Sequence, residues 1–218
     1  MSIGITENIG KSFDFAKTRL VGNWVDWIIL IILCIIPIIG WILLMGFAVR
    51  VYRGGEAKLG EWVKMLIDGI LMWIIGIVYG IVPMIVLFIF GGAALMNPMA
   101  MMDPNAAAAA VTGVSIIGLI ITLIVSIIFG IMATMAIVRF AKEEKLGAAF
   151  QFGEIFKIVG KIGWIHYILS WIVLMIVLGV IMGILLIIPI IGWILLLILA
   201  PLFLIWEARF FGQLYESA

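Results

Sequence analysis

Charged, thiol and imidazole side chains are scarce in this sequence, and each scarcity excludes a class of protein. Only 11% of the 218 residues are charged, whereas a soluble domain carries roughly a quarter, so a soluble globular protein is excluded. The single cysteine, Cys34, excludes a disulfide framework and a paired-thiol metal site. The single histidine, His166, has no Cys, Asp or Glu at ligand spacing, which excludes a metal site around it. A net charge of +1 excludes the clustered basic face that nucleic acid requires.

The motifs of common enzyme classes are also missing. The sequence contains no H-E-x-x-H, no G-x-S-x-G and no phosphate-cradling loop. We therefore expect a protein that is not an enzyme, with no catalytic residue, no cofactor and no metal.

Apolar residues make up 67% of the chain and gather in long runs. The runs 27–49, 69–95, 111–138 and 162–206 contain no Asp, Glu, Lys or Arg, and a membrane-spanning helix needs only about 20 such residues. Short polar links leave no room for a separate soluble domain. The sequence therefore predicts an all-α integral membrane protein, a helical bundle that forms one domain over 1–218. We expect its transmembrane helices at 66–92, 111–138, 163–188 and 190–207.

One ten-residue sequence, I-I-P-I-I-G-W-I-L-L, occurs twice, at 35–44 and again at 187–196. We interpret it as an internal duplication, with copies at roughly 6–53 and 147–212. Each copy is expected to turn inside the membrane, because proline disfavours helix at the preceding residue and glycine permits unusual backbone dihedrals. The expected turns lie at Pro37 and Gly40 in the first copy and at Pro189 and Gly192 in the second.

The two copies differ in the length of the helix before the turn. From Trp24 to Pro37 a helix would rise about 20 Å, and from Trp164 to Pro189 about 38 Å. Only the second can cross an apolar core of about 30 Å. We therefore expect 24–53 to be a short re-entrant hairpin. The alternative is a single kinked span there, which would give five transmembrane helices and an N-terminus outside.

The basic residues support the re-entrant hairpin. With it, every Lys and Arg falls on one side, which the positive-inside rule makes cytoplasmic. We thus expect a multi-pass protein of the cell (plasma) membrane with cytoplasmic N- and C-termini, and an outer connection at 97–105. Amphipathic patterns at 6–20 and 147–160 predict two interfacial helices. The apolar face of the first is expected to hold Ile9, Phe13, Ala16 and Leu20.

Small residues recur at helical spacing in three of the predicted spans. Such stripes let neighbouring helix backbones approach closely. The residues expected in helix packing are Gly76, Gly80, Gly118, Thr122, Ser126, Gly130, Gly179 and Gly183.

The motifs G-F-x-x-R-V-x-R (46–53), L-x-E-W (59–62), D-G (68–69) and I-V-Y-x-x-x-P (77–83) carry a resemblance. Together they resemble the archaeal and bacterial membrane family known as the domain of unknown function 4013 family. That family has no assigned activity. The resemblance therefore implies a multi-span membrane protein and adds no chemistry.

Four charged residues flank the short link before 66–92 and are candidates for contact with a lipid headgroup or a partner: Arg50, Arg53, Glu61 and Asp68. Basic residues just cytoplasmic of a helix attract anionic lipids. The structural alternative is that the arginines anchor the helix end and that Asp68 pairs locally, for example with Lys64 one turn earlier.

Two functions remain open from the sequence. The first is a non-enzymatic helix-packing subunit or scaffold that associates with itself, with another membrane subunit or with anionic lipid. The second is a transporter or carrier for an apolar or lipid-like cargo, because broken helices are a transporter device but the spans contain almost no ionisable groups.

Overall fold

The computed structural model describes residues 3–55, 57–95, 105 and 116–218, and these residues are helical with no strand. The all-α prediction is confirmed. Four helices are long and apolar enough to cross a membrane, over Trp62–Phe90, Gly118–Glu143, Trp164–Ile187 and Ile191–Glu216. The expected outer connection 97–105, apart from Asn105, and the first residues of the span predicted at 111–138 lie outside the described part of the chain.

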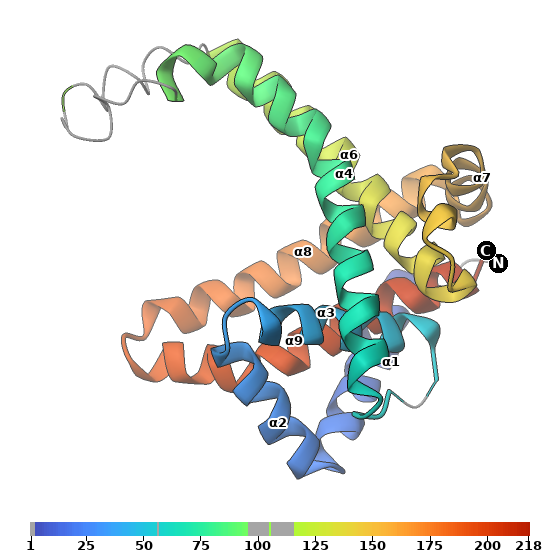
Figure 1. Ribbon diagram of the computed structural model, residues 1–218, viewed down its shortest axis with the longest axis vertical. Coiled ribbons are helices and arrows are strands. Elements are labelled where there is room, and N and C mark those ends of the chain that lie inside the picture. The colour runs from blue at the N-terminus through green and yellow to red at the C-terminus, as the bar shows by residue number, and fades with distance from the viewer. Residues whose placement is uncertain (1–2, 56, 96–104, 106–115) are drawn as a thin grey trace. The chain divides into compact units, whose positions relative to one another are not determined.

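The chain divides into two compact units, which we describe separately. The first consists of Met1–Ile75 and Thr134–Ala218, and the second is Gly76–Ala133. Figure 1 shows the helices, which are α1 (Ile5–Val21), α2 (Trp24–Ile35), α3 (Ile39–Arg53), α4 (Trp62–Leu95), α6 (Ile116–Glu143), the 3-10 helix η2 (Leu146–Phe150), α7 (Phe152–Ile162), α8 (Trp164–Ile187) and α9 (Ile191–Glu216).

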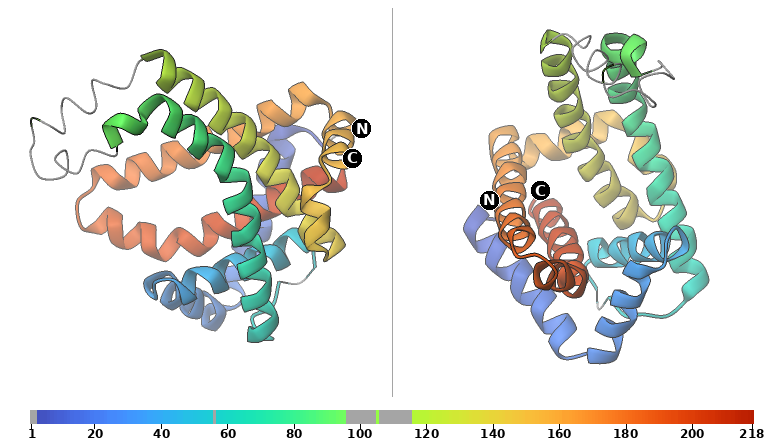
Figure 2. Two further views of the ribbon diagram at one scale, coloured as in Figure 1. Left: turned by 45° about the horizontal axis from the view of Figure 1, so that its top comes forward. Right: turned by 90° about the vertical axis from the view of Figure 1, so that its left-hand side faces the viewer.

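Helix α9 is the centre of the first unit. It contacts α1, α2, α3, α7 and α8, and its partnership with α8 is the hairpin drawn in orange and red in Figure 2. The predicted span ended at 207, but α9 continues to Glu216. The reason is burial, because Phe210, Phe211 and Leu214 in the extra turns are fully enclosed by protein.

Helix α1 packs on α9 through a face that shares Ala16 and Leu20 with the expected one and also includes Asn8 and Ser12. Asn8, Ser12, Ala16 and Leu20 are buried at a strict spacing of four, whereas Ile9 and Phe13 are only half-buried. The Asn8 side-chain nitrogen and the Ser12 hydroxyl are paired as donors, whereas the Asn8 side-chain oxygen is buried without a hydrogen-bond partner among the described residues. The Asn8 amide donates to the Phe210 carbonyl at 3.1 Å, and the Ser12 hydroxyl donates to the Asn8 carbonyl at 2.6 Å.

Both copies of the repeated sequence turn in the same way. The amide of Ile39 donates to the Pro37 carbonyl at 2.8 Å, and that of Ile191 donates to the Pro189 carbonyl at 2.8 Å. The central residue is left-handed in φ, at 61° for Ile38 and 67° for Ile190. This three-residue γ-turn is rare and strained, above all for a β-branched residue.

The glycines of the two turns serve a different purpose from the one expected. Gly40 and Gly192 are helical, and neither has a positive φ. A Cβ at Gly40 would clash with the Leu33 carbonyl oxygen, and one at Gly192 would clash with the Leu185 carbonyl oxygen. The glycines therefore permit the two arms of each hairpin to touch, while isoleucine takes the unusual dihedral.

Residues 24–53 form a helical hairpin in which α3 turns back and contacts α2. Neither arm is long enough to cross a membrane alone. A fifth span would have to combine α1 with α2, and these two helices are bent by 100° at residues 22–23. Membrane re-entry of this hairpin stays a prediction.

The interfacial helix predicted at 147–160 is divided in two. Residues Leu146–Phe150 form η2, and α7 begins only at Phe152. The break lies at Gln151, whose backbone and side-chain oxygens both accept hydrogen bonds from Arg139. Helix α7 is strongly amphipathic, and on its exposed face Lys157 pairs with Glu154 at 2.9 Å and lowers the pKa of that carboxyl.

The second unit contains parts of α4 and α6. Helix α4 continues through Pro83, and Gly118 of α6 lies against the Phe90 side chain of α4, where a Cβ would be only 2.6 Å from the Phe90 Cβ. The Thr122 hydroxyl donates to the Gly118 carbonyl at 2.8 Å. Gly118 therefore faces α4.

Candidate functional site at the charged ends of the helices

Two glycines place the ends of α3 and α4 beside each other. A Cβ at Gly46 of α3 would clash with the Met65 carbonyl oxygen of α4, and a Cβ at Gly69 of α4 would clash with the Ile42 carbonyl oxygen of α3. The two backbones therefore touch at this crossing. Neither glycine belongs to the predicted small-residue stripes. Gly46 begins the motif at 46–53, and Gly69 ends the motif at 68–69.

The crossing brings Arg53 and Asp68 together. Arg53 Nη1 lies 2.9 Å from Asp68 Oδ2, and both side chains are largely buried. Arg53 Nε also donates to the Ala141 carbonyl at 3.1 Å and lies 3.4 Å from Glu144 Oε1. The partner of Asp68 is thus an arginine of another helix, whereas Lys64 lies 3.8 Å from Glu144. This difference arises because α3 crosses α4 beside Asp68.

Arg50 binds the link between α3 and α4. Its guanidinium donates to the Lys58 carbonyl at 2.8 Å and to the Glu61 carbonyl at 3.2 Å, and the Glu61 carboxylate is 3.6 Å away. The Arg50 side chain is 14% exposed and that of Glu61 74% exposed. Arg50 therefore shapes the link mainly through backbone carbonyls.

These residues surround a cavity of about 400 Å³, which we call the basic cavity. Its lining is Arg50, Arg53, Gly55, Lys58, Leu59, Gly60, Glu61, Lys64 and Glu144. Three of the four candidate contact residues line it, and Asp68 pairs with one of them. The four basic side chains exceed the two acidic ones, so the cavity favours an anion.

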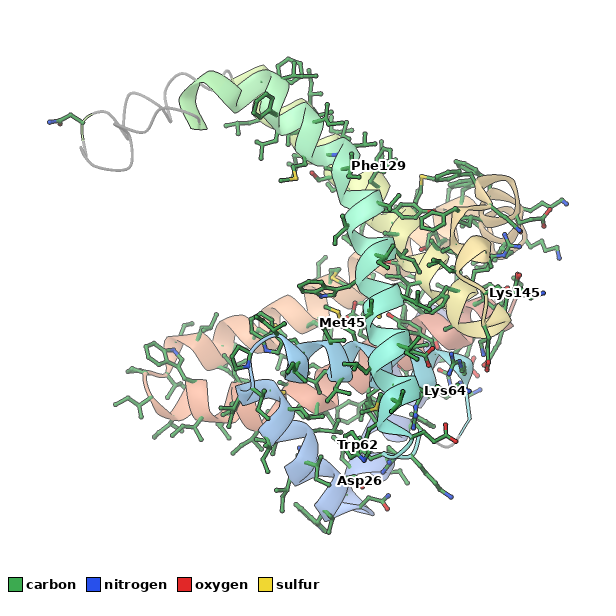
Figure 3. The ribbon with its side chains drawn as sticks, viewed as in Figure 1. Asp26, Met45, Trp62, Lys64, Phe129 and Lys145 are labelled. Carbon is green, nitrogen blue, oxygen red and sulfur yellow. The ribbon has the colours of Figure 1, made fainter. Side chains whose placement is uncertain are left out.

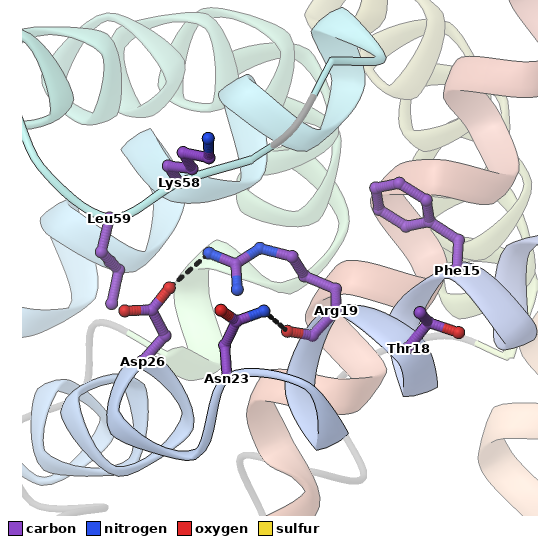
Figure 4. A pocket seen from close by; sticks show the side chains of 7 residues that line it. All are labelled: Phe15, Thr18, Arg19, Asn23, Asp26, Lys58 and Leu59. Atoms are coloured by element: carbon purple, nitrogen blue, oxygen red, sulfur yellow. Dashed lines mark hydrogen bonds and ion pairs between the residues drawn. The ribbon is translucent and has the colours of Figure 1, made fainter.

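A second cavity, of about 610 Å³, lies at the corner between α1 and α2 and is shown in Figure 4. Phe15, Thr18, Arg19, Asn23, Asp26, Lys58 and Leu59 line it. Arg19 is already neutralised there, because it lies 2.5 Å from Asp26 and also donates to the Ala57 carbonyl at 2.5 Å. We infer a structural role for this arginine, which ties the bend to the link.

The C-terminal end of α9 is clamped to α3 and α6. Glu216 Oε1 accepts from Lys142 at 2.5 Å and from Arg209 at 3.3 Å. This carboxylate lies beside Gly54, whose φ is 86°, and a Cβ at Gly54 would come within 2.5 Å of it. The left-handed conformation at residue 54 favours glycine. The cluster joins charged residues of α6 and α9 beside the C-terminal end of α3.

The other small residues that were expected in helix packing are not packed against a neighbouring helix of the described chain. Within the described part of the chain, an added Cβ at Gly76, Gly80, Gly130, Gly179 or Gly183 would have no atom within 4 Å other than nearby backbone of its own helix, and Ser126 is exposed. Among the described residues, no group of three or more His, Cys, Asp or Glu side chains is placed to hold a metal.

Comparison with family models gives one match, to a protein of unknown function (DUF4013), over residues 29–190. This is about three quarters of the chain. The chain belongs to the DUF4013 family. The DUF4013 region includes every residue that lines the basic cavity, whereas Phe15 to Asp26 of the corner cavity precede it. Comparisons with curated proteins and with solved structures give no match.

Proposed function

We propose that this DUF4013 protein is a non-enzymatic integral membrane protein that acts as a helix-packing subunit, associating with itself or with another membrane subunit. The observation that carries the proposal is the pair of open glycine faces. An added Cβ at Gly46 or Gly69 would meet the backbone of the neighbouring helix, but among the described residues one at Gly76, Gly80, Gly179 or Gly183 would meet no atom within 4 Å beyond the nearby backbone of its own helix. A small-residue face of this kind is the common surface for association between helices in a membrane.

Burial supports the same proposal. Only 11% of the apolar window in Trp62–Phe90 and in Gly118–Glu143 is buried inside the chain. Lipid or another subunit must therefore cover most of the surface of these helices.

The test is the oligomeric state of the full-length protein, measured by native mass spectrometry from a mild detergent. We expect a dimer or larger assembly that Gly80→Ile or Gly183→Ile converts to monomer, because a branched side chain prevents close approach. Ile77→Leu, on the same helix as Gly80, is the matched control and should leave the assembly intact. A wild-type monomer without a copurifying subunit, or an assembly indifferent to both glycine variants, would refute the proposal.

We further propose that the protein lies in the cell membrane with both termini cytoplasmic. Arg19 donates to the Ala57 carbonyl of the link, Arg53 donates to the Ala141 carbonyl, and Lys142 and Arg209 both donate to Glu216, so basic residues from four helices gather at one end of the first unit. The two termini also lie side by side there (Figure 1). A tag on the N-terminus should be protected from an impermeant reagent in intact cells, and labelling of that tag would overturn the orientation.

A carrier for an apolar or lipid-like cargo is the second candidate. A cavity of about 250 Å³ between the α2–α3 hairpin and α9 favours it, lined by Cys34, Trp41, Leu44, Met45, Ala200, Pro201 and Leu204. Ligand pockets usually measure about 300–1,000 Å³, so this one suits part of a chain rather than a whole lipid. Leu204→Trp would fill it, and retention of the same copurified lipid by that variant would count against a carrier.

A further inference from the structure

The basic cavity continues into an apolar hollow on α4. The hollow is lined by Glu61, Trp62, Val63, Lys64 and Ile67, so it shares Glu61 and Lys64 with the basic cavity. Figure 3 shows Trp62 and Lys64 together at the start of α4. One end of the combined site is cationic, and the other is walled by Trp62, Val63 and Ile67, which are 45%, 73% and 51% exposed. A ligand that fits both parts must be amphipathic.

The two acidic residues that line the basic cavity, Glu61 and Glu144, form only long ion pairs with Arg50 and Lys64. Arg50 to Glu61 and Lys64 to Glu144 measure 3.6 and 3.8 Å between nitrogen and oxygen, both longer than a hydrogen bond. The two glutamates are 74% and 56% exposed, so their carboxylates can turn into water when another anion enters. Asp68 is buried against Arg53 and stays in place. The exchangeable positive charge therefore lies on Arg50 and Lys64, and Lys58 lines the same cavity.

Backbone strain gathers at the same two acidic residues. Glu61 and Glu144 have φ of 45° and 55°, and they are two of only four non-glycine residues with positive φ in the described part of the chain. The other two are the central residues of the repeated turns. Such conformations cost about 1–3 kcal/mol each and cluster at ligand clamps and switch regions.

The position along α4 suits a lipid headgroup. The apolar span of α4 begins at Trp62, one residue after Glu61. In a bilayer the basic cavity would therefore lie at the level of the headgroups, and the exposed side chains of Val63 and Ile67 would lie at the level of the first acyl carbons.

We propose that the combined site binds one anionic glycerophospholipid, with the phosphate among Arg50, Lys58 and Lys64 and an acyl chain along Trp62, Val63 and Ile67. The inference rests on the membrane location in the proposed function and is independent of self-association. Recognition is electrostatic at one end and apolar at the other, so neither a zwitterionic lipid nor a free phosphate satisfies the whole site.

The experiment titrates the full-length protein in neutral detergent with three probes: a short-chain phosphatidylglycerol, the matching phosphatidylcholine and glycerol phosphate. Bound lipid is counted by native mass spectrometry. We expect phosphatidylglycerol to bind at least tenfold more tightly than either other probe, as several basic contacts imply. Equal binding of phosphatidylcholine would overturn the anion site, and equal binding of glycerol phosphate would overturn the lipid assignment.

The variants remove one half of the site at a time. Lys58→Gln with Lys64→Gln should weaken phosphatidylglycerol by about fivefold for each lysine. The matched control is Lys157→Gln, whose side chain is 70% exposed on α7, and it should change nothing. Ile67→Ser should weaken phosphatidylglycerol but leave glycerol phosphate unchanged. If the double lysine variant behaves like the control, the inference is wrong.

The same spectra separate this inference from the proposed function. Phosphatidylglycerol bound selectively to a monomer would support the lipid site and refute self-association. An oligomer without selective lipid binding would do the reverse.

Discussion

Replacing Gly69 by alanine should destabilise the protein, whereas the same change at Gly76, two helical turns along α4, should not. At Gly69 the new methyl group would clash with the Ile42 carbonyl oxygen, but at Gly76 it would meet no atom within 4 Å. The comparison keeps the helix and the residue types the same. It therefore isolates the backbone contact between α3 and α4.

The magnitude follows from two opposing terms. Alanine favours a helix over glycine by up to about 1 kcal/mol. Overpacking costs typically about 1–3 kcal/mol, and a backbone carbonyl cannot rotate away as a side chain can. We expect Gly69→Ala to lose about 2 kcal/mol net, which lowers the midpoint of thermal unfolding by about 4–8 °C for a chain of this size. Gly76→Ala should be unchanged or raise the midpoint by a few degrees.

Thermal unfolding in detergent, followed by fluorescence of the nine tryptophans, measures the difference. The protein is kept dilute enough to be monomeric, so that contacts between chains do not contribute. Gly46→Ala tests the reciprocal contact and should behave like Gly69→Ala. If Gly69→Ala is as stable as Gly76→Ala, then α3 and α4 do not touch through their backbones and the reasoning fails.

Two further predictions concern the hairpins. Ile190→Gly should raise the midpoint of thermal unfolding, because glycine removes the cost of about 1–3 kcal/mol that isoleucine pays for its positive φ. Ile191→Gly, at the next residue and inside α9, should lower the midpoint. Equal effects of the two variants would contradict a strained turn. Trp27 donates its indole N–H to the Ile198 carbonyl at 2.9 Å, next to the helix turn that a proline interrupts. Trp27→Phe should therefore cost about 1 kcal/mol in denaturant unfolding, while Trp193→Phe, 62% exposed, should cost nothing measurable.

The long helices could be predicted because their signal is local. An uncharged run of sufficient length needs no partner to be recognised, and α8 (Trp164–Ile187) agrees with the expected 163–188 to within one residue at each end. Helix ends were less predictable. The charged residues near 207 predict that the last span ends there. Helix α9 nevertheless extends to Glu216, because protein rather than water surrounds its final turns.

Candidate site residues were predictable as a group but not as pairs. Arg50, Arg53, Glu61 and Asp68 were chosen because they flank one short link, and three of them line the basic cavity. Their partners come from elsewhere. Glu144, on the far side of a long apolar segment, joins Arg53 and Lys64 there, and no sequence spacing indicates that contact.

The sequence by itself determined that the described part of the chain folds into helices, four of them long and apolar enough to span a membrane, and that the same ten residues recur at two bends. These properties depend on residue type and local spacing alone. Tertiary structure alone decided which glycines touch a neighbouring backbone, which arginine neutralises Asp68, and that isoleucine rather than glycine carries the left-handed dihedral. The reason is that each of these features depends on which two segments come into contact in space, and the spacing of residues along the sequence does not specify such contacts.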